Sequence, residues 1–141
     1  MKVRAFLIAD AVTTAQGKSY VHGGGITQIA GEFPVTQPIL YVLLRLERED
    51  ERLGSDHGVA IRLFTPTGEQ MVELTANYRL PGEADEDYPL TTDFVGHFEG
   101  LTFETPGTYR FAAFLDEAEI DTIPLLLLTE DQQQNWRTDR R

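Results

Sequence analysis

Residues 101–111 read LTFETPGTYRF, and this stretch decides how the rest of the chain is interpreted. Pro106 and Gly107 are typical of a tight turn, because proline presets φ and glycine accepts a positive φ. The residues after the turn favour a strand with Tyr109 and Phe111 on one face, since successive side chains of a strand point to opposite faces. The stretch therefore predicts two strands joined by a turn, and we expect Pro106, Gly107 and Tyr109 to be structural residues.

The rest of the chain repeats this pattern of strands and turns. Short runs rich in β-branched and aromatic residues alternate with proline and glycine turn signals, and no long window has the apolar period of a helix. Three consecutive glycines at positions 23–25 indicate a bulge or bend within the second run. The predicted strands are Lys2–Ala9, Lys18–Ile29, Pro38–Arg48, Gly58–Thr65, Glu69–Tyr78, Thr91–Glu99, Thr108–Leu115 and Glu119–Leu128.

Length and composition fit one globular domain. The chain has 141 residues, of which 41% are hydrophobic and 25% charged, so it is long enough to bury a core without disulfides or metals. Many short strands with regular turns predict an all-β fold, a two-sheet antiparallel β-sandwich of about eight strands over residues 1–128. Residues 129–141 are polar and rich in glutamine, and we expect them to form a flexible C-terminal tail.

The turn at Pro106 and Gly107 delivers Tyr109 close to the start of a strand, with an apolar residue two positions further on. This arrangement resembles the tyrosine corner of fibronectin-type and immunoglobulin-like sandwiches, in which the phenol hydroxyl caps upstream backbone at a Greek-key crossover. The resemblance implies an immunoglobulin-like Greek-key order of strands.

Residues 1–128 also resemble an uncharacterised prokaryotic family of short β-sandwich proteins, a domain of unknown function. The shared features are an N-terminal strand, an early glycine-containing hairpin, the long strand Ile39–Glu47, the turn and strand Pro106–Phe111, and a final strand that begins at Pro124. Members of the family often have Asp-Gly where this chain has Asp116-Glu117. The family carries no assigned activity, so the resemblance implies a fold and no site.

No motif in the sequence predicts a catalytic site. There is no cysteine, which excludes disulfides, thiolate nucleophiles and thiolate metal centres. The three histidines, His22, His57 and His97, lie in separate segments and do not predict a shared metal site. Ser55, Asp56 and His57 have the residue types of a catalytic triad, but adjacent positions do not easily align the three groups. We expect no catalytic residue, no cofactor and no enzymatic activity.

Acidic residues outnumber basic ones by 23 to 12, which gives a formal net charge of −11. This charge repels phosphate, so we expect neither a nucleic acid nor an anionic membrane as a partner. If successive strands are antiparallel, the loops after Arg48, Tyr78 and Leu115 share one end of the sandwich and make it acidic. Carboxylates in such loops are ligands that calcium prefers. The loops lack the alternating aspartates that wrap one ion, so we expect a solvated acidic end and no metal site; the candidates for the calcium alternative are Asp56, Asp85, Glu86, Asp87 and Asp116.

Two of the predicted strands hold more apolar residues than one buried face requires. Residues 39–44 (ILYVLL) and 125–128 (LLLL) are apolar on both faces, and the outer face needs a cover. We expect that cover to be either Phe33 and Trp136 within the chain or an interface with another chain. The candidate interface residues are Ile39, Tyr41, Leu43, Leu126 and Leu128.

These observations favour a non-enzymatic binding or assembly module, either a homo-oligomer or a protein that binds an unidentified protein partner. The alternative is a ligand-binding sandwich that holds calcium or a carbohydrate at the acidic end, near Tyr88. The apolar stretch Ala5–Ala9 is interrupted by Asp10 and is too short for a signal peptide or a membrane span. We therefore expect a cytoplasmic protein.

Overall fold

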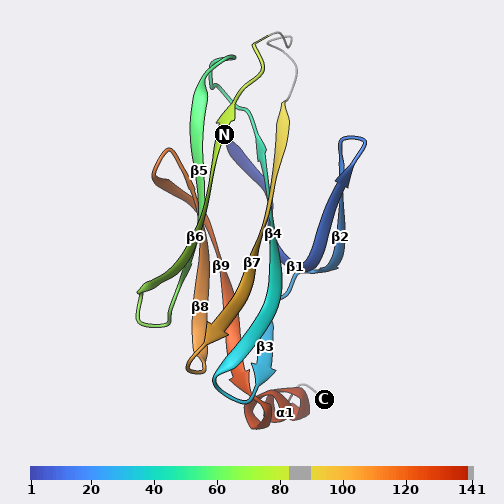
Figure 1. Ribbon diagram of the computed structural model, residues 1–141, viewed down its shortest axis with the longest axis vertical. Coiled ribbons are helices and arrows are strands. Elements are labelled where there is room, and N and C mark those ends of the chain that lie inside the picture. Colours follow the sequence, from blue (N-terminus) through green and yellow to red (C-terminus); the bar gives the residue numbers. More distant parts are fainter. Residues whose placement is uncertain (83–89, 140–141) are drawn as a thin grey trace.

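The structure, a computed structural model, describes residues 1–82 and 90–139. Within these residues the chain forms nine strands and one helix (Figure 1). The elements are β1 (Lys2–Ala15), β2 (Lys18–Gly24), β3 (Gln28–Gly31), β4 (Val35–Glu47), β5 (Asp56–Phe64), β6 (Gln70–Arg79), β7 (Thr91–Phe103), β8 (Gly107–Leu115), β9 (Ala118–Thr129) and α1 (Glu130–Asp139). One sheet has the strand order β2-β1-β4-β7 and the other the order β3-β9-β8-β5-β6.

The predicted all-β sandwich of two sheets is confirmed. Neighbouring strands are antiparallel, except that β3 runs parallel to β9. Alternate side chains of both sheets point inward and form one main core. The immunoglobulin-like order of strands stays a prediction. The largest fully buried side chains are Phe103, Phe111, Ile8, Leu40, Leu44, Leu46, Leu63, Leu80, Leu125, Leu127 and Val42.

The predicted second strand is divided at its glycines into β2 and β3. Gly23 has a φ of +59°, and a Cβ added there would collide with the Asp10 side chain, so this position favours glycine. Beyond the glycines the Ile26 amide donates to the Ile8 carbonyl at 3.0 Å, and the chain then leaves the first sheet. The glycines therefore allow β3 to join β9 in the second sheet.

The β1–β2 hairpin covers part of the outer face of the first sheet. β1 pairs with β4 only as far as Ala9 and beyond that only with β2. Figure 1 shows the hairpin standing beside β4, on the side away from the second sheet. Val12 of the hairpin packs there in a second apolar cluster with Leu43 of β4, which is only 5% exposed. Ser19 of the hairpin donates a hydrogen bond to Asp93 of β7 and fixes the hairpin over the sheet.

Tyr109 is anchored at the start of β8, close to the predicted turn. Its hydroxyl donates to the Thr105 carbonyl at 2.8 Å, and its buried ring meets the Phe103 ring edge-on at 4.9 Å between centroids. Gly107 has a φ of +145°, a conformation that favours glycine. Tyr109 therefore joins the end of β7 to the start of β8.

Most of the segment that we expected to be a flexible tail is helix α1. The Gln132 amide donates to Thr129 Oγ1 at 3.2 Å, and the Thr129 amide donates to Gln132 Oε1 at 2.9 Å. These reciprocal bonds form a capping box, which satisfies amides at the start of a helix. Glu130 and Asp131 in the first turn favour the same helix through its dipole. The side chain of Trp136, one of the two expected covers, lies outside the described part of the structure.

Candidate functional site

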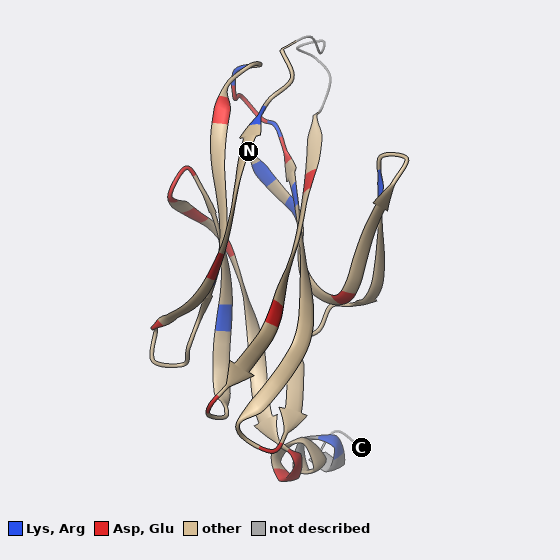
Figure 2. Cartoon of the chain, in the orientation of Figure 1, with Lys and Arg blue, Asp and Glu red and all other residues tan. Residues whose placement is uncertain are grey.

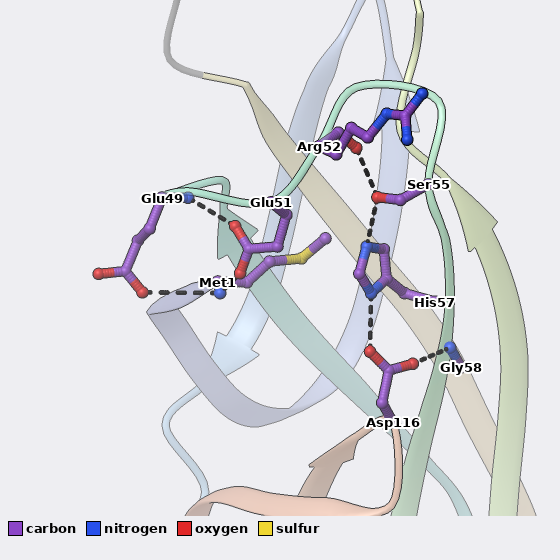
Figure 3. A network of polar contacts seen from close by, with 8 residues as sticks. All are labelled: Met1, Glu49, Glu51, Arg52, Ser55, His57, Gly58 and Asp116. Carbon is purple, nitrogen blue, oxygen red and sulfur yellow. Dashed lines mark hydrogen bonds and ion pairs between the residues drawn. The ribbon is translucent and has the colours of Figure 1, made fainter.

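Ser55, His57 and Asp116 come together at one end of the sandwich (Figure 3). Ser55 ends the loop between β4 and β5, and His57 is the second residue of β5. Asp116 and Glu117 form the turn between β8 and β9, with φ values of +49° and +67°. A positive φ at both residues is what a two-residue hairpin turn of type I′ requires. Because β5 and β8 are neighbours, this turn places the Asp116 carboxylate beside His57.

The contacts within this group run in one continuous line. Ser55 Oγ lies 2.8 Å from His57 Nε2, and His57 Nδ1 lies 2.7 Å from Asp116 Oδ2. The Gly58 amide donates to the other oxygen of the carboxylate, Asp116 Oδ1, at 2.9 Å. The hydrogen bond from the imidazole, and then the one from the Gly58 amide, lower the pKa of the Asp116 carboxyl from its ordinary value. The network therefore ties the β8–β9 turn to β5.

The order of these atoms is that of a serine–histidine–aspartate triad, but the hydroxyl is placed for another role. Ser55 Oγ also donates to the Arg52 carbonyl at 2.5 Å, and a hydroxyl has only one proton to donate. The amides of Gly54 and Ser55 donate to the carbonyls of Leu80 and Arg52, so neither is available as an oxyanion-hole donor. These contacts fit a serine that closes a turn better than they fit a nucleophile.

The end of the sandwich that we predicted to be acidic also carries cations. Figure 2 shows Lys and Arg interleaved with Asp and Glu around this end. The Met1 ammonium group pairs with Glu51 and lies 3.6 Å from Glu49, and Arg79 lies 3.6 Å from Asp56. The described part of this end therefore carries charges of both signs, and four of its carboxylates lie within ion-pair distance of a cation or a histidine.

The structure also places the metal candidates and the histidines. Asp56 pairs with Arg79 and Asp116 with His57, whereas Asp85, Glu86 and Asp87 lie outside the described residues, as does Tyr88. His22 is in β2 and His97 in β7, on different strands from His57. In residues 1–82 and 90–139, no three His, Asp or Glu side chains are grouped so that they could hold a metal ion.

A groove opens along the side of the sandwich where β6 and β7 face each other. In the described residues β6 pairs only with β5 and β7 only with β4, so each strand ends its sheet. The groove has a volume of about 370 Å³ and reaches the core between the sheets. Its floor is formed by Val42, Val59 and Ile61, and its walls by Leu74, Thr75 and Ala76 of β6 and Phe94, Val95, Gly96 and His97 of β7. We name this feature the β6–β7 groove.

Two contacts between the walls define the shape of the β6–β7 groove. A Cβ added at Gly96 would lie 2.7 Å from Leu74 Cδ1, so Leu74 occupies the space that a side chain at position 96 would take. Nearer the loop end, Thr92 donates a hydrogen bond to the Tyr78 hydroxyl, and the Tyr78 ring meets Phe94 edge-on at 5.5 Å. This groove was not predicted from the sequence, although a glycine inside a strand does signal close approach of a neighbour.

The candidate interface residues fall into two groups. Leu43 is buried beneath the β1–β2 hairpin, so the chain covers this residue itself. Ile39, Tyr41, Leu126 and Leu128 are partly exposed, and the Tyr41 ring lies 5.3 Å from the His97 ring. Self-association through these four residues stays a prediction.

The chain is thus a small all-β sandwich with the Ser55–His57–Asp116 network at one end and the β6–β7 groove along one side. The chain belongs to a family of unknown function, DUF6941, whose model matches residues 4–128. No curated protein matches the chain. No helix within residues 1–82 and 90–139 is long and apolar enough to cross a membrane.

Proposed function

We propose that the chain is a non-enzymatic module that binds another protein, and that an extended segment of this partner occupies the β6–β7 groove. The observation that carries the proposal is the groove itself, which lies between two edge strands and reaches the core. An extended segment can add to the edge of a sheet through main-chain hydrogen bonds while its alternate side chains enter pockets. The β6–β7 groove offers both requirements in one place.

The walls of the groove support an extended occupant. They include three consecutive residues of β6 and four consecutive residues of β7. Successive side chains of a strand point to opposite faces, so a consecutive run means that the groove follows the backbone edge of each strand. Edge backbone groups are a ready template for pairing with another chain.

The contacts around Ser55 support the non-enzymatic part of the proposal. The Ser55 proton is directed to the Arg52 carbonyl, and the nearby amides already have acceptors. A fluorophosphonate probe, which labels activated serines, is therefore expected to leave the native chain unlabelled. Labelling that disappears in Ser55→Ala would contradict this part of the proposal.

The binding part is tested with Val95→Arg, which places a bulky cation on the wall of the groove. The matched control is Val21→Arg on β2, because Val95 and Val21 are 36% and 38% exposed. The probe is a synthetic peptide with valine at alternate positions, shown by sedimentation to be monomeric. We expect it to shift amide resonances of β6 and β7 in the native chain and in Val21→Arg, but not in Val95→Arg. Shifts that are confined to other strands would overturn the proposal.

A further inference from the structure

We infer that the partner segment adds to the edge of β7 and alternates apolar side chains, which enter the groove, with cationic side chains, which face solvent. This inference rests on the proposed function and adds the strand that receives the segment and the chemistry of the segment. Three features of the described residues carry it: the apolar floor of the groove, the edge of β7, and the charge around that edge.

The floor of the β6–β7 groove selects apolar side chains. Val42, Val59 and Ile61 point inward from β4 and β5 and belong to the main core. A side chain that reaches them leaves water, and burying a valine, leucine or isoleucine is favourable by roughly 1.5–3 kcal/mol. Only every second residue of an extended segment can point this way. The segment is therefore apolar at alternate positions.

The edge of β7 is the better acceptor of the two walls. β7 has 13 residues and β6 has 10, so β7 offers the longer template. Four consecutive residues of β7, from Phe94 to His97, line the groove. Leu74 of β6 projects across the groove and lies against Gly96, so it narrows the groove from the β6 side, whereas Gly96 adds no side chain to the β7 wall. The Tyr78–Thr92 hydrogen bond joins the walls near the loop end, so the segment lies on the other side of this contact.

The charge around β7 favours a cationic segment. The Glu99 side chain is 74% exposed and lies two positions beyond His97, which lines the groove and pairs with Glu99 at 3.3 Å. The formal net charge of the whole chain is −11. Such a field attracts a basic partner and raises its association rate, whereas a second copy of this chain is repelled. Charge complementarity therefore selects a basic segment of another protein over a second copy as the occupant.

The test compares three peptides that share valine at alternate positions and have lysine, serine or glutamate between them. We expect the lysine peptide to bind the native chain at least about tenfold more tightly than the serine peptide, and the glutamate peptide not to bind. The difference between the lysine and serine peptides is expected to shrink as salt is added. Equal binding of these two peptides would overturn the inference and leave the proposed function in place. If none of the three peptides binds, both fail.

Glu99→Lys tests the placement on β7, with Glu32→Lys as the control that makes the same charge change in the loop before β4. We expect Glu99→Lys to weaken the binding of the lysine peptide several-fold more than Glu32→Lys does, because Glu99 lies on β7 beside His97 of the groove wall, whereas Glu32 precedes β4. Equal effects would mean that the segment does not follow β7. Sedimentation equilibrium of the native chain provides the last check. A dimer that Val95→Arg dissociates would assign the groove to a second copy and overturn the inference.

Discussion

The first sheet has an outer face and a free edge at β7, and the chain covers these two regions to different extents. On the outer face, the β1–β2 hairpin lies over Leu43, and a hydrogen bond from Ser19 to Asp93 holds the hairpin in place. Along the edge of β7, the β6–β7 groove leads to the core, and Val95 at this edge is 36% exposed. The chain therefore covers Leu43 on the outer face and leaves the edge of β7 without a neighbouring strand among the described residues.

This difference also separates two kinds of apolar residue that look alike in the sequence. Leu43 and Val95 each lie in a strand of the first sheet and are paired across β4 and β7. Leu43 is 5% exposed beneath the hairpin, whereas Val95 is 36% exposed at the edge of the sheet. The predictions below test this distinction, beginning with the largest expected effect.

Truncation of the two paired residues should affect stability very differently. We expect Leu43→Ala to lower the free energy of unfolding by about 2–3 kcal/mol, because it leaves a cavity beneath the hairpin. Val95→Ala should change it by less than about 0.5 kcal/mol, as substitutions of exposed residues usually do. Urea denaturation of both variants measures the two values. Equal losses would mean that the two sides do not differ in this way.

Tyr109→Phe should lower the free energy of unfolding and affect the covered outer face and the edge of β7 equally. The change removes the hydrogen bond to the Thr105 carbonyl and leaves that acceptor without its partner, at a cost of about 1 kcal/mol. The same urea measurement gives the loss, and hydrogen exchange shows whether the hairpin and the groove are affected alike. An unchanged unfolding midpoint would show that this residue is not a tyrosine corner.

Low pH should destabilise the contact between the β1–β2 hairpin and the first sheet, because this contact depends on the ionised Asp93 carboxylate. Hydrogen bonds from Arg45, reinforced by one from Ser19, lower the pKa of the Asp93 carboxyl, and partial burial opposes them. A carboxyl whose pKa is lowered in the folded state adds stability above its unfolded pKa, near about 4, and this stability is lost as the pH falls through the folded value. Stability measured between neutral and acid pH should therefore fall less in Asp93→Asn than in the native chain. Glu99→Gln on the open side is the control, and an identical fall in all three proteins would refute the assignment.

The smallest effect is expected from calcium at the end of the sandwich that holds Asp56 and Asp116, away from both the outer face and the groove. Asp56 and Asp116 are already engaged by Arg79 and His57, so we predict that millimolar calcium leaves the melting temperature unchanged. A thermal melt with and without calcium gives the result. A rise of several degrees that Glu86→Gln or Asp87→Asn removes would favour calcium binding, the alternative function, over the proposed one.

The strands could be predicted from the sequence because alternation and turn signals are local. Gly107 and the glycines at 23–25 mark a turn and a bend through their own conformational freedom, and the structure has both. Helix α1 was missed although Thr129 and Gln132 have the spacing of a capping box. The segment after them lacks an apolar stripe, and that stripe is the signal on which a helix prediction usually depends.

The site residues were harder to predict because their neighbours are distant in the chain. Ser55 and His57 were considered with Asp56, the adjacent acid, yet the carboxylate that reaches His57 belongs to Asp116 in another hairpin. The β6–β7 groove likewise depends on how the edges of two sheets face each other. No alternation within β6 or β7 contains that information.

The parallel pairing of β3 with β9 has a consequence for folding during synthesis on the ribosome. Gln28 pairs with Leu126, so β3 emerges long before the strand that completes its sheet has been synthesised. The β1–β2, β5–β6 and β8–β9 hairpins need only local contacts and can form early, whereas contacts between distant segments form slowly. The β1–β2 hairpin can therefore form on the nascent chain while β3 still lacks its partner, because the pairing of β3 with β9 requires the last strand of the second sheet.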